Sequence, residues 1–265
     1  MNRIKVGVIG GGLISQVEHL PNLLQMPERF SVDPGTTLAM DLTSGSAFPA
    51  LDAAIEPSRV TKAAYRVARH TADLTALTPA EHSLRLNATL GEAGIATLWV
   101  DLAPRTIELA PKDVEEYLTE IGASDLVKQR WLATPGKRWR EMYSKHAKAF
   151  VRVGDGGSDR SWSEPVGMFL EIVPQSDPTK LVAGGELIVE VLRDGGTIPS
   201  FSIAMSREGS PGQQMQKTDG GGLATFKLDA AGRWLVHGTL LRAMPGPDVE
   251  WESHFAALTV DVAAP

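Results

Sequence analysis

The sequence predicts a mainly β protein with two β-sandwich domains, a helical insertion in the first, and an orphan βα segment before it. Apolar runs of strand length recur along residues 165–262 and are separated by Gly-rich turns. Residues 81–90 alternate between apolar and polar side chains, whereas residues 111–121 have a helical period. Short strands with frequent turns are typical of antiparallel sandwiches.

Composition limits the classes of function. The chain has 265 residues, of which 43% are hydrophobic and 22% charged, as in an ordinary globular protein. A net charge of -6 without a basic stripe argues against nucleic acid as a principal partner. The absence of cysteine excludes disulfides, thiolate zinc sites and cysteine nucleophiles. No apolar run reaches the roughly 18 residues of a membrane span.

The second domain is predicted over residues 165–265. An apolar run at 186–192 is followed by an Asp-Gly turn and a second run at 197–206, which together indicate a hairpin. Further strands are expected at 224–228, 234–241 and 251–262. Strands at this spacing favour a sandwich of the immunoglobulin type.

The first domain is predicted over residues 30–160, with strands at 36–42, 58–67, 81–90, 95–102 and 150–153. Its helical insertion covers 111–131. Val114, Leu118 and Ile121 fall on one helical face there, and Gly122 is a candidate C-cap. Residues 154–165, rich in Gly, Ser and Asp, are the expected linker.

Residues 1–29 have a different character. A short apolar strand at 4–9 leads into a glycine-rich turn with Gly10, Gly12 and Ser15, and then into an expected helix at 16–26. This segment resembles the start of the glucose-fructose oxidoreductase/inositol dehydrogenase family, which implies a nicotinamide cofactor at those three residues. The repeated βαβ units of a dinucleotide fold do not follow, and Asp33 also suits a turn. We therefore expect a fragment that does not bind NAD(P).

A second resemblance covers residues 30–262. It rests on six segments that occur in order along the chain: 116–118, 143–150, 167–174, 217–220, 232–236, and 251–253 with 258–259. They resemble a bacterial β-sandwich family of unknown function whose members were once given the name NikM, after a component of nickel uptake. The resemblance implies an exported, periplasmic protein. The N-terminus has no small-x-small cleavage site, however, so a cytoplasmic location is the alternative.

Histidines supply the candidate metal ligands. His146 lies between Lys145 and Lys148, whose positive charges favour a neutral imidazole, as a metal ligand requires. The same basic cluster is alternatively a site for an anion. The competing interpretation is a solvated basic turn paired with the acidic helix. His237 and His254 are expected on neighbouring strands, with Glu252 or Asp248 as an oxygen ligand; hydrogen-bonded histidines at a sandwich edge are the alternative.

No nucleophile elbow or shared pair of carboxylates is visible in the sequence. We therefore predict a non-enzymatic exported binding or accessory protein of unknown ligand, linked to transition-metal (nickel) uptake. Its expected partners are a small ligand, a metal ion or a membrane transport component. The alternative is an NAD(P)-dependent oxidoreductase, which requires the N-terminal glycine motif to be functional.

Overall fold

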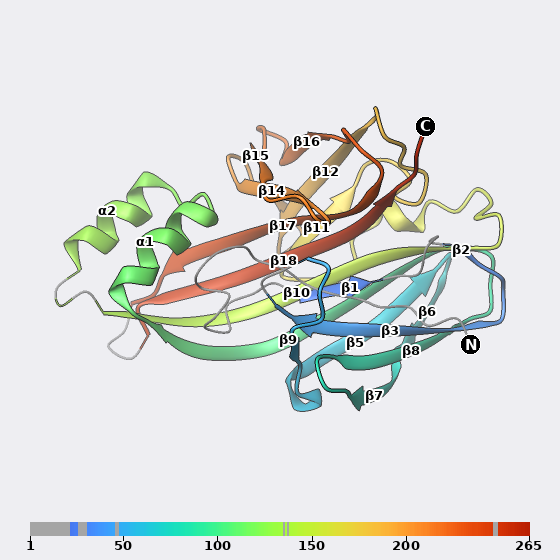
Figure 1. Cartoon of the computed structure of the whole chain (residues 1–265), viewed down its shortest axis with the longest axis horizontal. Coiled ribbons are helices and arrows are strands. Elements are labelled where there is room, and N and C mark those ends of the chain that lie inside the picture. Colours follow the sequence, from blue (N-terminus) through green and yellow to red (C-terminus); the bar gives the residue numbers. More distant parts are fainter. Residues whose placement is uncertain (1–21, 26–30, 46–47, 135, 137, 246–248) are drawn as a thin grey trace.

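The computed structural model of the chain describes residues 22–25, 31–45, 48–134, 136, 138–245 and 249–265 (Figure 1). Within these ranges the chain is mainly β and forms three sheets, which we call A, B and C. The long strands of sheet B cross the middle of the molecule, and sheets A and C lie on either side of them (Figure 1). The predicted mainly β sandwich architecture is confirmed.

Sheets A and C are the outer layers. Sheet A is antiparallel and contains β1 (Asn22–Gln25), β3 (Thr36–Ser44), β4 (Ala53–Ala54), β7 (Thr75–Pro79) and β8 (Leu84–Leu90). Sheet C is antiparallel and contains β11 (Leu170–Pro174), β12 (Glu186–Arg193), β13 (Gly196–Thr197) and β16 (Leu223–Lys227). In β8, Leu84, Leu86, Ala88 and Leu90 are buried, so the predicted alternation is confirmed.

Sheet B runs in the order β15-β14-β17-β18-β10-β9-β5-β6, and β2 pairs with the end of β10. Its strands are β2 (Ser31–Val32), β5 (Val60–Val67), β6 (His70–Asp73), β9 (Gly94–Leu109), β10 (Trp139–Val153), β14 (Ser202–Arg207), β15 (Gln213–Lys217), β17 (Gly232–Ala243) and β18 (Trp251–Val262). β10 and β18 pair in parallel from Glu141 opposite Trp251 to Ala149 opposite Thr259. This pairing makes sheet B continuous from the N-terminal to the C-terminal part of the chain.

Two cores lie on opposite faces of sheet B. β10 contributes Ala147, Ala149, Val151 and Val153 to the core beneath sheet A, and Phe150 to the core beneath sheet C. Alternate side chains of a strand point to opposite faces, so one strand serves both cores. The result is two sandwiches that share a central sheet.

The helical insertion covers one end of the strands β10 and β18 (Figure 1). α1 (Pro111–Glu120) buries Val114 and Leu118 as its period predicts, and also Tyr117, whereas the predicted Ile121 follows the helix and is partly buried. α2 (Asp125–Ala133) buries Trp131. Gly122 ends α1 in the left-handed region at φ 61°, and Ala123 N–H donates to the Leu118 carbonyl at 2.9 Å. Ile121 is the C-cap, and Gly122 is the left-handed residue after it, so the predicted glycine signal for the end of α1 is confirmed.

Several local predictions are wrong. The sequence predicts a helix over 16–26, but residues 22–25 form the strand β1 and pair with β3. The sequence predicts a hairpin between 186–192 and 197–206. After the Asp194-Gly195 turn only β13 (Gly196–Thr197) pairs with β12, because the chain then crosses to sheet B and starts β14. The strand expected at 150–153 begins at Trp139. Within the described ranges, parallel pairing between named strands is confined to β10 with β18 and β2, an isolated parallel bridge joins Val182 to Ala263, and no doubly wound parallel sheet is present.

The expected linker at 154–165 is packed against the rest of the molecule. It contains the 3-10 turn η4 (Ser161–Ser163), in which Trp162 is buried. The Asp159 carboxylate accepts hydrogen bonds from the backbone N–H groups of Ala68, Ile95 and Ser161. A second 3-10 turn, η2 (Pro57–Arg59), precedes β5.

Candidate functional site

Four titratable side chains meet on the face of sheet B that is directed toward sheet C. Asp101 of β9 lies opposite His146 of β10, and β18 adds Glu252 and His254 through its parallel pairing with β10. Residues of a strand separated by two share one face, which is why Glu252 and His254 lie together. We call these four residues the histidine cluster.

The histidine cluster forms a chain of close contacts. Asp101 Oδ1 lies 2.6 Å from His146 Nδ1, and His146 Nε2 lies 3.1 Å from His254 Nδ1. On the far side, His254 Nε2 is 3.6 Å from Glu252 Oε1. The two imidazole rings lie 15° from parallel, and the Phe169 ring covers His254 at a centroid distance of 4.1 Å. Each histidine therefore has one nitrogen toward a carboxylate and the other toward its partner histidine.

Burial keeps His254 neutral. Its pKa is lowered to about 4, mainly because burial removes water from the imidazolium and also because of the charge of His146; Glu252 opposes this shift. His146 Nδ1 faces the Asp101 carboxylate, which accepts its proton. His146 Nε2 and His254 Nδ1 face each other at hydrogen-bond distance, so a single proton lies between the two rings.

This arrangement could hold a metal ion by losing that proton. His146 Nε2 and His254 Nδ1 would both become ligands, while Asp101 and Glu252 would accept from the outer nitrogens. Carboxylates in that position orient histidine ligands and raise their basicity. Within the described ranges, no three His, Asp or Glu side chains are arranged as a complete set of ligands. The two imidazoles are the protein donors that the structure offers.

The other predicted ligands lie elsewhere. His237 of β17 directly follows Val236, which belongs to the core beneath sheet C, so the His237 side chain points to the opposite face of sheet B. It is buried, which lowers its pKa to about 4, and Ser206 Oγ lies 3.5 Å from its Nε2. Gly10, Gly12, Ser15 and Asp248 lie outside the described residues.

The basic cluster at 145–148 is not a solvated turn, so that alternative is wrong. Lys145 and Lys148 are 1% and 2% exposed and point to opposite faces of β10. Lys145 Nζ donates to Ser44 Oγ at 2.9 Å, and Lys148 pairs with the buried Glu171. Sequence reasoning missed Asp101 and Glu171; the available signal was an acidic residue within each of two apolar runs.

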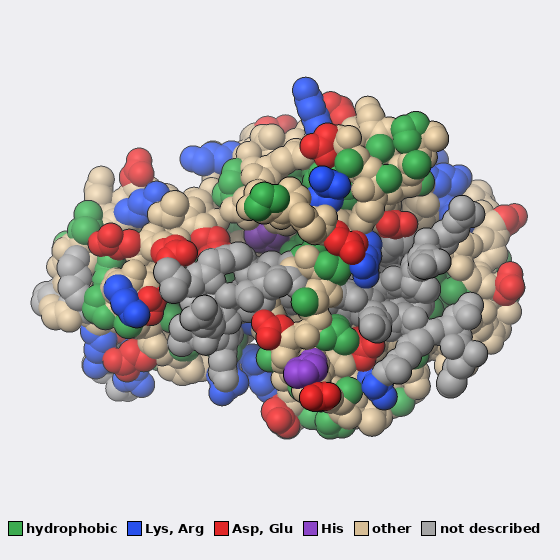
Figure 2. Space-filling view, in the orientation of Figure 1, with side chains coloured by type: hydrophobic (Ala, Val, Ile, Leu, Met, Phe, Trp, Pro, Cys, Tyr) green, Lys and Arg blue, Asp and Glu red, His purple; other side chains and the backbone are tan. Residues whose placement is uncertain are grey.

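Figure 2 shows one face of the molecule, on which acidic side chains (red) and basic side chains (blue) are interspersed.

None of the helices that the structure describes is long and apolar enough to cross a membrane.

Comparison with known proteins identifies the family of this chain but does not identify an activity. No curated protein matches the chain. Two solved structures align over most of it: the D0-D1 domain of Intimin (13% identity, 88% of this chain and 95% of that one) and the D00-D0 domain of Intimin (11%, 91% and 99%). Both have a TM-score of 0.22, too low to support an argument. The domain of unknown function DUF4198 matches residues 22–240, and the chain belongs to that family.

Proposed function

We propose that the protein is a non-enzymatic binding module that takes one transition-metal ion between His146 and His254. One observation carries the proposal: two inward nitrogens lie 3.1 Å apart, and each outer nitrogen faces a carboxylate. Two nitrogens bound tetrahedrally to one ion at ~2.0–2.1 Å lie about 3.3 Å apart. A small movement of the two rings away from each other brings their inward nitrogens to this distance and makes room for the ion.

The ligand chemistry favours nickel, copper or zinc. Imidazole suits all three ions, and the chain has no thiolate to change that preference. A metal ligand must be unprotonated, and the lowered pKa of His254 meets that requirement at neutral pH. Export to the periplasm and delivery of nickel to a membrane transport component belong to the proposal through the resemblance of residues 30–262.

Calorimetry with nickel, copper and zinc at pH 7.5 tests the proposal on the tag-free protein. We expect at least one ion to bind with a Kd below about 100 μM. His146→Ala and His254→Ala should each abolish this binding. Asp101→Asn should weaken it by about 10- to 100-fold, because the orientation of His146 is lost while both ligands remain.

The matched controls are histidines outside the cluster. His82→Ala changes a side chain that is 54% exposed and should leave binding intact. His237→Ala should also retain the ion, because His237 lies on the other face of sheet B. Absence of binding below about 100 μM, or retention of binding by both cluster variants, would contradict the proposal.

A further inference from the structure

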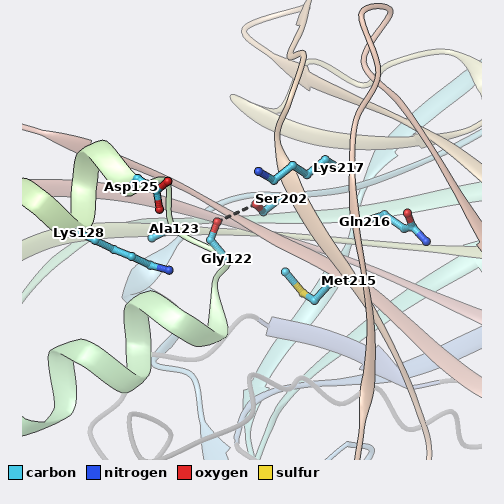
Figure 3. Close-up of a pocket in the computed structure, with 8 residues that line it drawn as sticks. All are labelled: Gly122, Ala123, Asp125, Lys128, Ser202, Met215, Gln216 and Lys217. Atoms are coloured by element: carbon cyan, nitrogen blue, oxygen red, sulfur yellow. Dashed lines mark hydrogen bonds between the residues drawn. The ribbon is translucent and has the colours of Figure 1, made fainter.

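A pocket lies between the turn that joins α1 to α2 and the hairpin of β14 and β15 (Figure 3). Its volume is about 420 Å³, and none of its lining residues belongs to the histidine cluster. The helical side supplies Gly122, Ala123, Asp125 and Lys128, and the hairpin supplies Ser202, Met215, Gln216 and Lys217. Pockets of this size hold small molecules, whereas one water occupies about 30 Å³.

The two walls of the pocket are fixed to each other. Ser202 Oγ donates to the Gly122 carbonyl at 2.7 Å, and Gln213 Nε2 donates to the Glu120 carbonyl at 3.4 Å. A Cβ atom at Gly122 would lie 2.8 Å from Met215 Cε and 2.9 Å from Ser202 Cβ. The close approach of the helical turn to the hairpin therefore requires glycine, and the pocket is formed before a ligand arrives.

The pocket carries excess positive charge. Figure 3 shows Lys128 of α2 and Lys217 of β15 pointing from opposite walls into the space between them, with Asp125 on the helical side. Among the residues placed in the structure, the lysines in ion pairs are Lys62, Lys112, Lys148 and Lys180, and neither pocket lysine belongs to this group. Two cations against one carboxylate leave a net charge of about +1.

The neighbouring acid does not cancel this charge at pH 7. Burial and the charge of Glu116 raise the pKa of Glu120, at the end of α1, to about 8. Glu120 is therefore mostly protonated. The positive pocket contrasts with the net charge of -6 for the whole chain.

We infer that this pocket binds a small organic dicarboxylate, with one carboxylate on Lys128 and the other on Lys217. Ammonium groups on opposite walls suit two separated anionic groups better than one compact anion. The carbon chain between the carboxylates would contact Met215, whose thioether adapts to irregular apolar surfaces. The inference does not depend on the proposed metal site.

Calorimetry with succinate at low ionic strength tests the inference on the full chain. We expect a Kd of about 1 mM or lower. Lys128→Gln and Lys217→Gln should each weaken binding at least about tenfold, since each removes one hydrogen bond between charged groups. Asp125→Asn should strengthen binding, because it removes the negative charge from the pocket wall.

Lys112→Gln is the matched control, because Lys112 lies on the adjacent α1 with a side chain 82% exposed; it should bind succinate normally. Succinamide, which has the same carbon chain without charge, should not bind. Inorganic phosphate should bind more weakly than succinate. No binding of succinate at 10 mM, about tenfold above the expected Kd, would overturn the inference. Equal binding by both lysine variants, by succinamide or by phosphate would also overturn it.

Discussion

Lys148 of β10 and Glu171 of β11 form an ion pair in which the side chains are 2% and 1% exposed. The Glu171 carboxylate also accepts hydrogen bonds from the backbone N–H groups of Val166, Gly167 and Met168, at 2.8, 3.0 and 3.1 Å. The pair therefore joins sheet B to the first strand of sheet C and fixes the segment that leads into it.

Lys148→Met should destabilise the protein by about 3–5 kcal/mol. Methionine fills a similar volume, but it leaves the Glu171 carboxylate buried without its cation. The measurement is urea denaturation at pH 7. Lys62→Met is the control, because the Lys62–Asp73 pair is exposed (48% and 75%) and should contribute about 0–1 kcal/mol. If the two variants lost the same amount of unfolding free energy, Lys148 would not hold the sheets together.

Glu141 of β10 is a buried carboxylate beneath α1. It accepts hydrogen bonds from Tyr117 Oη at 3.0 Å, from Trp139 Nε1 at 2.7 Å and from Ser253 Oγ. Burial raises its pKa to about 7, although the three hydrogen bonds oppose the shift. The folded state thus binds a proton that the unfolded state has lost between about pH 4.5 and 7, and this group reduces stability as the pH rises through that range.

Tyr117→Phe should therefore lower the free energy of unfolding more at pH 8 than at pH 5.5. At pH 8 the lost hydrogen bond goes to a charged carboxylate and is worth about 1.5–3 kcal/mol, against about 0.5–1.5 kcal/mol for a neutral acceptor. Denaturation at both pH values measures the difference. Tyr65→Phe loses a hydrogen bond to the Thr89 carbonyl, and its cost should not depend on pH. A Tyr117→Phe cost that is the same at both pH values would contradict the assigned role of Glu141.

His237 should contribute to acid unfolding. Its pKa falls from 6.5 to about 4 because burial disfavours the imidazolium, so the unfolded state binds the proton first as the pH drops. Stability is lost between about pH 6.5 and 4, by roughly 3 kcal/mol for this group. His237→Gln should flatten that part of the stability profile. His82→Gln, at a side chain 54% exposed, should follow the wild type.

Asp159 should hold the segment 154–165 in place. It accepts hydrogen bonds from the backbone N–H groups of Ala68, in the turn after β5, Ile95 of β9 and Ser161. Burial opposes the shift, but these hydrogen bonds lower the pKa of the carboxyl group. Asp159→Ala should make the segment susceptible to limited proteolysis under conditions that leave the wild type intact. Mass spectrometry of the products locates the cut. Cleavage of the wild type at the same rate would show a flexible linker.

The sequence by itself determined the features that depend on local periodicity and turn chemistry. These features are the alternation at 84–90, the strand at 251–262, the apolar face of α1 and the glycine after it. Each follows from side chains within one or two helical turns, or within a few residues of one strand. The sequence also pointed to His146, His254 and Glu252, because their side-chain chemistry is visible in the residue types.

Tertiary structure alone decided which of these residues meet. His146 and His254 are 108 residues apart, and only the parallel pairing of β10 with β18 brings their nitrogens to 3.1 Å. The antiparallel pairing of β9 with β10 places Asp101 beside them, while the two-residue period of β17 directs His237 to the other face. Strand order and direction are set by packing between distant segments, because the sheet buries both faces and local patterns do not encode its neighbours.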